Sequence, residues 1–107
     1  MTIKLPRIIS QYVDASNKHD VKSILSCFSD DALVRDEREE FHGKKSIEGW
    51  IVKTIGKYKF QFKPLSVNDH DTVVVRMEVS GTFDGSPVTL DYHFVIENDK
   101  ILSLSVK

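Results

Sequence analysis

The sequence has no long hydrophobic run, no internal repeat and only one cysteine. Its apolar stretches are too short for a membrane-spanning helix, and its first residues lack the apolar region and cleavage site of a signal peptide. We therefore expect a cytoplasmic protein that does not bind membranes. Cys27 cannot form an internal disulfide, and its apolar neighbours Ile24 and Phe28 indicate a small core residue rather than a nucleophile.

An excess of charge of either sign is also missing. Fifteen Lys and Arg residues stand against sixteen Asp and Glu residues, which gives a formal net charge of -1. Without a basic excess, the chain cannot bind a nucleic acid or an anionic membrane through counterion release. The composition therefore argues against a nucleic-acid-binding protein.

Apolar residues are plentiful enough for a folded core. Hydrophobic residues make up 40% of the 107 residues and charged residues 29%, with six Phe, three Tyr and one Trp. A chain of this length and composition folds without disulfides or metal. Since no stretch resembles a linker, we expect one domain over residues 1–107.

The period of the apolar residues predicts three helices in the first half of the chain. Apolar residues fall on one face of a 3.6-residue helix in 5–13, in 21–28 and in 47–55. Asp20 is a good N-cap for the second helix, and Gly56 is expected to end the third. Residues 32–37 have the pattern of a short strand, and 37–40 that of a charged loop.

From Tyr58 onward, the apolar residues alternate with period two, as in β-strands. The phase changes at Pro64, which predicts a bulge or an edge strand. Asp84-Gly85 and Asn98-Asp99 indicate hairpin turns. The pattern therefore predicts a meander of four antiparallel strands, and helices before such a sheet are typical of an α+β domain with the helices on one concave face.

The opposite face of this sheet is expected to be mixed rather than purely polar. Val74, Val88, Val95 and Ile101 are predicted on it, among charged side chains. This texture is typical of a weakly apolar dimer interface, and we expect a homodimer. Exposure of this face to solvent is the alternative.

Three motifs and the order of the elements resemble those of a known family. The motifs are residues 11–20 (QYVDASNKHD), 28–36 (FSDDALVRD) and 42–47 (HGKKSI). They resemble the first half of a ketosteroid isomerase or SnoaL-like protein of the nuclear transport factor two-like superfamily, and the resemblance spans nearly the whole chain. It implies a cone-shaped, cystatin-like α+β barrel.

The resemblance also implies roles for three residues. At the place of Tyr12 the family has an oxyanion donor, and at the place of Asp36 a general base that moves a proton beside a carbonyl. The isomerase's second donor is an acid, and Tyr92 stands there instead. A phenol is already protonated at neutral pH, so this replacement keeps a donor.

The residue pattern by itself gives these three side chains an inward direction. If Ala32 and Val34 face the core, Asp36 faces it too. Tyr12 lies on the apolar stripe of the first helix, and Tyr92 shares the parity of the inward residues of its strand. The alternatives are an acid that extends into the charged loop and two tyrosines that fill the core.

Other side chains are expected to line the pocket of the cone, although each could be plain core. They are Trp50, Phe28, Phe60, Phe62, Met77 and Phe94, with His42 near the mouth. The four histidines lack the spacing of paired metal ligands and there is no CxxC motif, so no metal site is expected.

These residues lead to a hypothesis of function. We expect proton transfer on a small, largely apolar carbonyl compound, with Asp36 as base and Tyr12 and Tyr92 stabilising the enolate oxygen, and without an organic cofactor. The first alternative is a ligand-binding or protein-association module without turnover. The second is a cyclase or hydrolase in which Asp36 activates water or substrate, because this superfamily carries several reactions on one fold.

Overall fold

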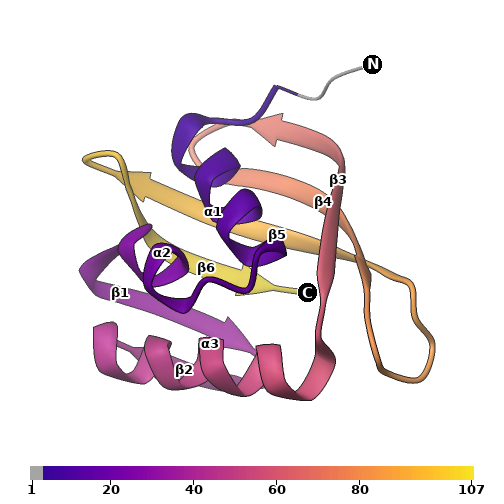
Figure 1. The fold of residues 1–107 in the computed structure, drawn as a ribbon. Coiled ribbons are helices and arrows are strands. Elements are labelled where there is room, and N and C mark those ends of the chain that lie inside the picture. The colour runs from indigo at the N-terminus through magenta and orange to yellow at the C-terminus, as the bar shows by residue number, and fades with distance from the viewer. Residues whose placement is uncertain (1–3) are drawn as a thin grey trace.

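In the computed structural model, residues 4–107 form a curved six-stranded sheet whose concave side holds three helices (Figure 1). The helices are α1 (Arg7–Asn17), α2 (Val21–Ser26) and α3 (Lys44–Tyr58). The strands are β1 (Phe28–Asp36), β2 (Glu39–His42), β3 (Gln61–Asp69), β4 (Val73–Ser80), β5 (Val88–Glu97) and β6 (Lys100–Val106). The α+β fold expected from the sequence is confirmed.

The three helices follow the predicted apolar faces. In α1 the residues that share this face, among them Ile9 and Tyr12, are buried against the sheet. Asp20 caps α2 by accepting a hydrogen bond from the Ser23 backbone N–H at 3.2 Å, as predicted. Among residues 4–107, no helix is long and apolar enough to cross a membrane.

Helix α3 is longer at both ends than the expected span of 47–55. It begins after Gly43, whose φ of +86° suits glycine, and it ends before Lys59, which is in the left-handed conformation. The expected stop at Gly56 was wrong, because a glycine inside a helix costs only about 1 kcal/mol and the helix runs past it. Tyr58 is therefore the last helical residue rather than the start of a strand.

The strands are arranged in the order β2-β1-β6-β5-β4-β3. Strands β3 to β6 form the predicted antiparallel meander. A register shift follows Pro64, and β3 lies at the edge of the sheet, so both expectations for this proline are confirmed. Strand β1 pairs with β6 in parallel and with β2 in antiparallel orientation.

Two expectations for the segment before α3 were wrong. Strand β1 begins at Phe28, well before the expected residue 32, because Phe28 pairs with Ile101 and an irregularity absorbs the polar residues between Phe28 and Leu33. The second half of the expected charged loop, Glu39 and Glu40, belongs to strand β2, whose register opposite β1 places Glu39 against Asp36. Charged residues are tolerated there because β2 is an edge strand.

The two sheet faces also differ from expectation at two residues. Val88 pairs with the buried Val79 and lies on the concave side. Ile101 is fully buried because the β5–β6 register shifts between Val95 and Ile96, which reverses the parity of β6 at this end. Of the four residues expected on the outer face, only Val74 and Val95 remain there.

Helix α1 is fastened to the start of β3 by one side chain. Asn17 Oδ1 accepts a hydrogen bond from the Phe62 backbone N–H at 2.6 Å, and Asn17 Nδ2 donates to the Phe62 carbonyl at 3.0 Å. A strand-like pair of bonds thus joins a helix end to an edge strand. These two bonds hold the backbone of Phe62, whose side chain is buried on the concave side of the sheet.

Candidate functional site

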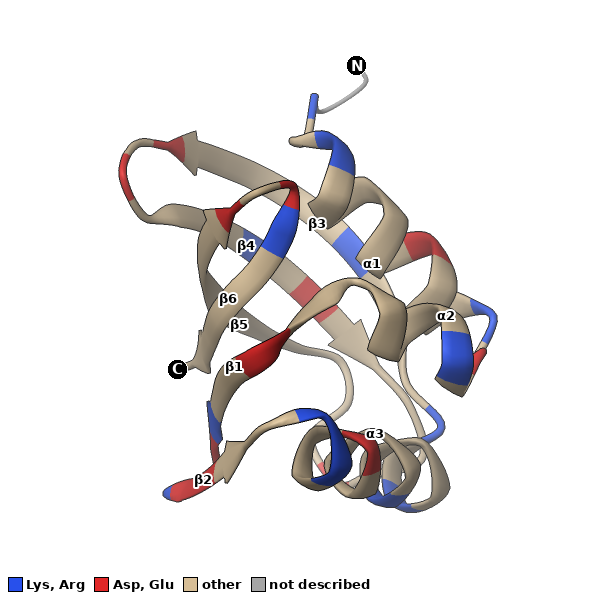
Figure 2. Ribbon diagram, turned by 90° about the vertical axis from the view of Figure 1, so that its left-hand side faces the viewer, with Lys and Arg blue, Asp and Glu red and all other residues tan. Residues whose placement is uncertain are grey.

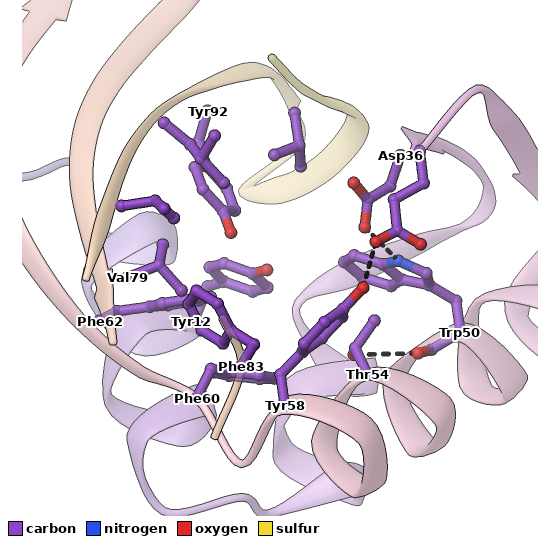
Figure 3. A pocket seen from close by; sticks show the side chains of 14 residues that line it. Tyr12, Asp36, Trp50, Thr54, Tyr58, Phe60, Phe62, Val79, Phe83 and Tyr92 are labelled. Atoms are coloured by element: carbon purple, nitrogen blue, oxygen red, sulfur yellow. Dashed lines mark hydrogen bonds between the residues drawn. The ribbon is translucent and has the colours of Figure 1, made fainter. Parts of the chain in front are cut away.

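A cavity of about 280 Å³ lies between the concave sheet, α3 and the turn between β1 and β2 (Figure 3). Its volume is at the small end of the range for small-molecule sites. Half of the 14 lining residues are aromatic, namely Tyr12, Trp50, Tyr58, Phe60, Phe62, Phe83 and Tyr92. The two carboxyl groups of the lining belong to Asp36 and Glu37.

Tyr12 and Tyr92 supply hydroxyl groups at the deep end of the cavity. Their side chains are 2% and 6% exposed, and Figure 3 shows both hydroxyl oxygens directed into the cavity. Burial raises the pKa of each phenol, and Tyr92 near Tyr12 and the charge of Asp36 near Tyr92 raise these values further. A hydrogen bond with Ser16 opposes the rise in the pKa of Tyr12, but the net direction stays upward. Both hydroxyls are therefore protonated donors at neutral pH.

Asp36 ends strand β1 with its side chain directed into the cavity, as strand parity predicted (Figure 3). The indole Nε1–H of Trp50 donates a hydrogen bond to Asp36 Oδ2 at 3.0 Å and so fixes the orientation of the carboxyl group. Burial raises the pKa of Asp36, the bond from Trp50 opposes this shift, and the charge of Glu37 adds to it. The net direction is upward, which brings the carboxyl group closer to the pKa that a general base needs.

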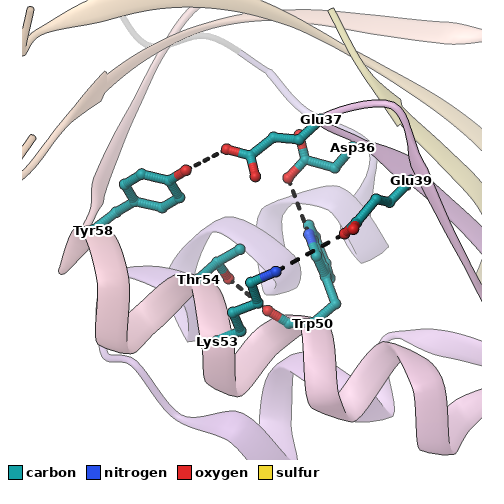
Figure 4. A network of polar contacts seen from close by, with 7 residues as sticks. All are labelled: Asp36, Glu37, Glu39, Trp50, Lys53, Thr54 and Tyr58. Atoms are coloured by element: carbon teal, nitrogen blue, oxygen red, sulfur yellow. Dashed lines mark hydrogen bonds and ion pairs between the residues drawn. The ribbon is translucent and has the colours of Figure 1, made fainter.

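Glu37 reaches the same cavity although strand alternation would send it to the other face. The chain turns at Glu37 and Arg38, whose φ angles are 52° and 66°, and this left-handed turn returns the Glu37 side chain to the concave side. Its carboxylate accepts a hydrogen bond from the Tyr58 hydroxyl (Figure 4). The sequence offered no signal for this residue, because such turns normally contain Gly, Asn or Asp.

The mouth of the cavity consists of Glu37, Tyr58 and Phe83, which are more exposed than Tyr12 and Tyr92. The rings of Tyr58 and Phe83 meet edge to face with centroids 5.6 Å apart. The bond to Glu37 is the main cause of the raised pKa of Tyr58. Helix α3, the β1–β2 turn and the β4–β5 loop therefore meet at one hydrogen-bonded aromatic entrance.

Of the predicted ligand contacts, Trp50, Phe60 and Phe62 line the cavity. The rings of Phe60 and Phe62 stack with centroids 4.7 Å apart and form part of its wall. Sequence reasoning did not place Tyr58 or Phe83 in the site. Tyr58 was expected in a strand, and Phe83 lies in the loop before β5 rather than in β4.

The other predicted contacts lie elsewhere. Phe28, Met77 and Phe94 are fully buried and are not among the lining residues, so they are core residues rather than candidate ligand contacts. Phe28 and Phe94 pack edge to face against the Tyr12 ring, with centroid distances of 5.9 and 5.6 Å, and thereby support it. His42 is exposed on β2 opposite Leu33, outside the cavity lining, because its parity directs it to the outer face.

The comparison with protein families agrees with this geometry. The family described as SnoaL-like domain matches residues 9–103. The chain belongs to the SnoaL-like domain family. The resemblance inferred from the three sequence motifs is thereby confirmed. A search of curated protein sequences gave no significant match.

Solved structures of SnoaL-like and related folds superpose closely. A Sinorhizobium meliloti protein described as a candidate polyketide cyclase is 36% identical, with 96% of this chain and 95% of that chain covered and a TM-score of 0.92. A Catenulispora acidiphila protein with a ketosteroid isomerase-like fold, in complex with trimethylamine, is 16% identical, with 97% and 86% covered and a TM-score of 0.84. A designed 17-OHP binder is 12% identical, with 92% and 86% covered and a TM-score of 0.80.

Proposed function

We propose that this SnoaL-like protein binds a small, largely apolar carbonyl compound and moves a proton on the carbon next to its carbonyl group. One observation carries the proposal. A half-buried carboxyl group, Asp36, and two buried phenol hydroxyls, Tyr12 and Tyr92, face one apolar cavity. Acid–base catalysis on a carbonyl compound needs this combination of a base and donors.

In the proposed reaction, the substrate carbonyl oxygen accepts hydrogen bonds from Tyr12 and Tyr92. The Asp36 carboxylate takes a proton from the adjacent carbon, and the electron pair of the broken C–H bond moves to the carbonyl oxygen as an enolate. The phenols stabilise this negative charge in a largely apolar cavity, where hydrogen bonds to a charge are strong. Asp36 then returns the proton to the same carbon or, where a C=C bond is conjugated with the enolate, to the far end of the conjugated system, so the step is redox-neutral.

The raised pKa of Asp36 supports its role as base. A carboxylate with an ordinary pKa is a weak base at neutral pH, and burial improves the match to the proton that it must accept. The bond from Trp50 limits this rise and holds the carboxyl group in place. Phenols with raised pKa values donate hydrogen bonds without ionising, which suits oxyanion stabilisation.

A cyclase reaction is the second candidate, and the 36% identical Sinorhizobium meliloti protein, described as a candidate polyketide cyclase, favours it. The same enolate would attack a second carbonyl carbon of the substrate instead of being reprotonated. A binding module without turnover is the third, and the designed 17-OHP binder supports it. The small cavity favours a compact substrate in each case.

Hydrogen–deuterium exchange tests the proposal without knowledge of the natural substrate. A panel of small ketones is incubated with the protein in D₂O, and NMR follows deuterium uptake next to the carbonyl. Asp36→Asn should remove the enzyme-dependent exchange, because an amide cannot accept the proton. Tyr12→Phe and Tyr92→Phe should each lower it by about 10²–10³, the effect of deleting one oxyanion donor.

Asp31→Asn is the matched control, since Asp31 is an exposed acid of the same strand outside the cavity lining. It should keep full exchange activity. Full activity in Asp36→Asn would reject the assignment of the base. Tight binding of ketones without any exchange would instead favour the binding module.

We also propose that two copies pair through the outer face of the sheet. Val74 and Val95 lie half-buried on this face, beside the ion pair of Arg76 with Asp91 at 3.2 Å. Sedimentation velocity should show a dimer at micromolar concentration, and Val95→Lys should shift it to monomer. A concentration-independent monomer of the unsubstituted chain would reject the proposal.

A further inference from the structure

From the distribution of charge around the cavity, we infer that its ligand carries a positively charged or neutral group at the mouth and a hydrogen-bond acceptor at the deep end. Anionic ligands such as carboxylates and phosphates are rejected. This inference rests on the proposed function, because it names the charge class of the compound that the same cavity takes.

The cavity lining has acidic groups without basic ones. No Lys, Arg or His from residues 4–107 is among the side chains that form it, whereas Asp36 and Glu37 both are. In Figure 2 the tip of the β1–β2 hairpin, where these two residues lie, is largely coloured acidic. A second negative charge brought into this apolar space would have no counter-charge and would be repelled.

The mouth combines a carboxylate with aromatic faces, which together attract cations. Glu37 is held in place by the Tyr58 hydroxyl, and the rings of Tyr58, Phe83 and Trp50 lie along the same lining. Aromatic faces bind ammonium groups, and most strongly when water is excluded. Lys57 Nζ already lies 5.0 Å from the centroid of the Tyr58 ring.

Lys57 does not cancel this preference. Tyr58 and the charges of Glu37 and Asp36 raise the pKa of Lys57, so its ammonium interacts with the mouth from outside. Its side chain is exposed and does not line the cavity, so water weakens its effect on a ligand inside. Lys53 contacts Glu39 at 3.9 Å and is likewise outside the cavity. In Figure 4 the Lys53 ammonium is directed toward Glu39, whereas Asp36 and Glu37 are the acids of this network that line the cavity.

The deep end sets the opposite requirement. The hydroxyls of Tyr12 and Tyr92 are each more than nine-tenths buried and are directed into the cavity. A ligand lone pair at this end can accept hydrogen bonds from both hydroxyls, whereas an apolar ligand group there would leave them facing no acceptor in the cavity. The two ends are chemically distinct, and they define both the charge and the orientation of the ligand.

Three acetophenones test the inference, because they share the carbonyl and carry para substituents of different charge, the first two of which have the same shape. These are the trimethylammonio (cationic), tert-butyl (neutral) and carboxylate (anionic) compounds. The protein has one Trp, whose indole N–H signal in ¹⁵N NMR reports binding at Asp36 directly. The cationic compound should bind about tenfold or more tightly than the neutral one, and the anionic compound should bind most weakly.

Two variants locate the preference. Glu37→Gln keeps an acceptor for the Tyr58 hydroxyl but removes the charge, so it should weaken the cationic compound about fivefold or more and leave the neutral compound unchanged. Glu40→Gln is the matched control, because Glu40 pairs with Arg35 at 2.9 Å and is not part of the lining. It should change neither affinity.

The outcomes separate this inference from the proposed function. Equal or tighter binding of the anionic compound, or no advantage for the cationic one, overturns the inference, even if deuterium exchange proceeds. A fourth compound, phenyltrimethylammonium, carries the positive charge but no carbonyl group. If it binds and none of the acetophenones does, the charge preference is retained and the carbonyl ligand is rejected. Absence of binding by all four compounds overturns both.

Discussion

Replacement of Trp50 by Phe removes one hydrogen bond while most of the ring stays in place. Trp50 is 7% exposed, and its Nε1–H donates to Asp36 Oδ2 at 3.0 Å. A net hydrogen bond to a charged group is worth about 1.5–3 kcal/mol, and the lower end applies because Asp36 is only half-buried. One pKa unit corresponds to about 1.4 kcal/mol, so the pKa of Asp36 should rise by about one unit.

Carbon-13 NMR of the Asp36 carboxyl group measures this shift without a substrate. The folded-state pKa of Asp36 is already raised, so the folded state binds its proton more tightly than the unfolded chain. Its effect on stability therefore becomes more unfavourable as the pH rises from about 4 through the folded-state value. In Trp50→Phe the folded-state pKa is higher still, so the pH range over which stability falls extends further upward. The substitution should therefore lower the free energy of unfolding by about 1 kcal/mol more at pH 7 than at pH 3.

The Asp36→Asn background is the control for this experiment. Without the titrating carboxyl group, Trp50→Phe should cost the same free energy at pH 3 and pH 7, since neither the packing loss nor the loss of a bond to an amide oxygen titrates in this range. An unchanged Asp36 pKa in Trp50→Phe would refute the reasoning. It would mean that solvent replaces the indole bond without loss.

Three further substitutions have expected effects on stability that chemical or thermal unfolding can measure. Asn17→Ala should lower the free energy of unfolding by about 2–3 kcal/mol, because it leaves the Phe62 backbone N–H and carbonyl without partners; a loss below about 0.5 kcal/mol would show that water replaces both bonds. Gly81→Ala should cost about 1–3 kcal/mol, because the added carbon would overlap the Tyr58 carbonyl oxygen, and an unchanged Tm would contradict this close approach. Asp20→Ala should lower the Tm at pH 7 and should lower it progressively less as the pH falls below about 4, because hydrogen bonds lower the folded-state pKa of Asp20 and their stabilisation is lost as the pH falls through that value; a loss that does not change with pH would contradict this.

The helices and the meander could be predicted because each rests on a local period. The faces of α1 and α3 repeat every 3.6 residues, and β4 and the centre of β5 alternate between buried and more exposed residues. Strand β2 could not be found this way. Its residues Glu39–His42 are mostly exposed, so they show no apolar pattern. Backbone pairing with β1 holds them in place, and this pairing does not depend on the type of side chain.

The candidate site could be predicted in part for the same reason. The cavity is lined by three predicted residues, Asp36, Tyr12 and Tyr92. Each lies on the apolar face of its strand or helix, so the apolar period predicted the direction of its side chain. Glu37 breaks the alternation because its φ is positive, and nothing in its own residue type indicates this. Backbone turns of this kind depend on the pairing of whole strands rather than on the residues at the turn.

The parallel pairing of β1 with β6 has a consequence for synthesis of the chain on the ribosome. Val34 lies opposite Leu104, a partner translated seventy positions later. The hairpin of β1 and β2, which carries Asp36, can join the rest of the sheet only after β6 has left the ribosomal tunnel. Contacts so distant in sequence slow folding, because the intervening chain must first close into a loop. Of the cavity walls, the one formed by β1 and β6 is therefore completed last, and a nascent chain that still lacks β6 cannot present the complete pocket to a ligand.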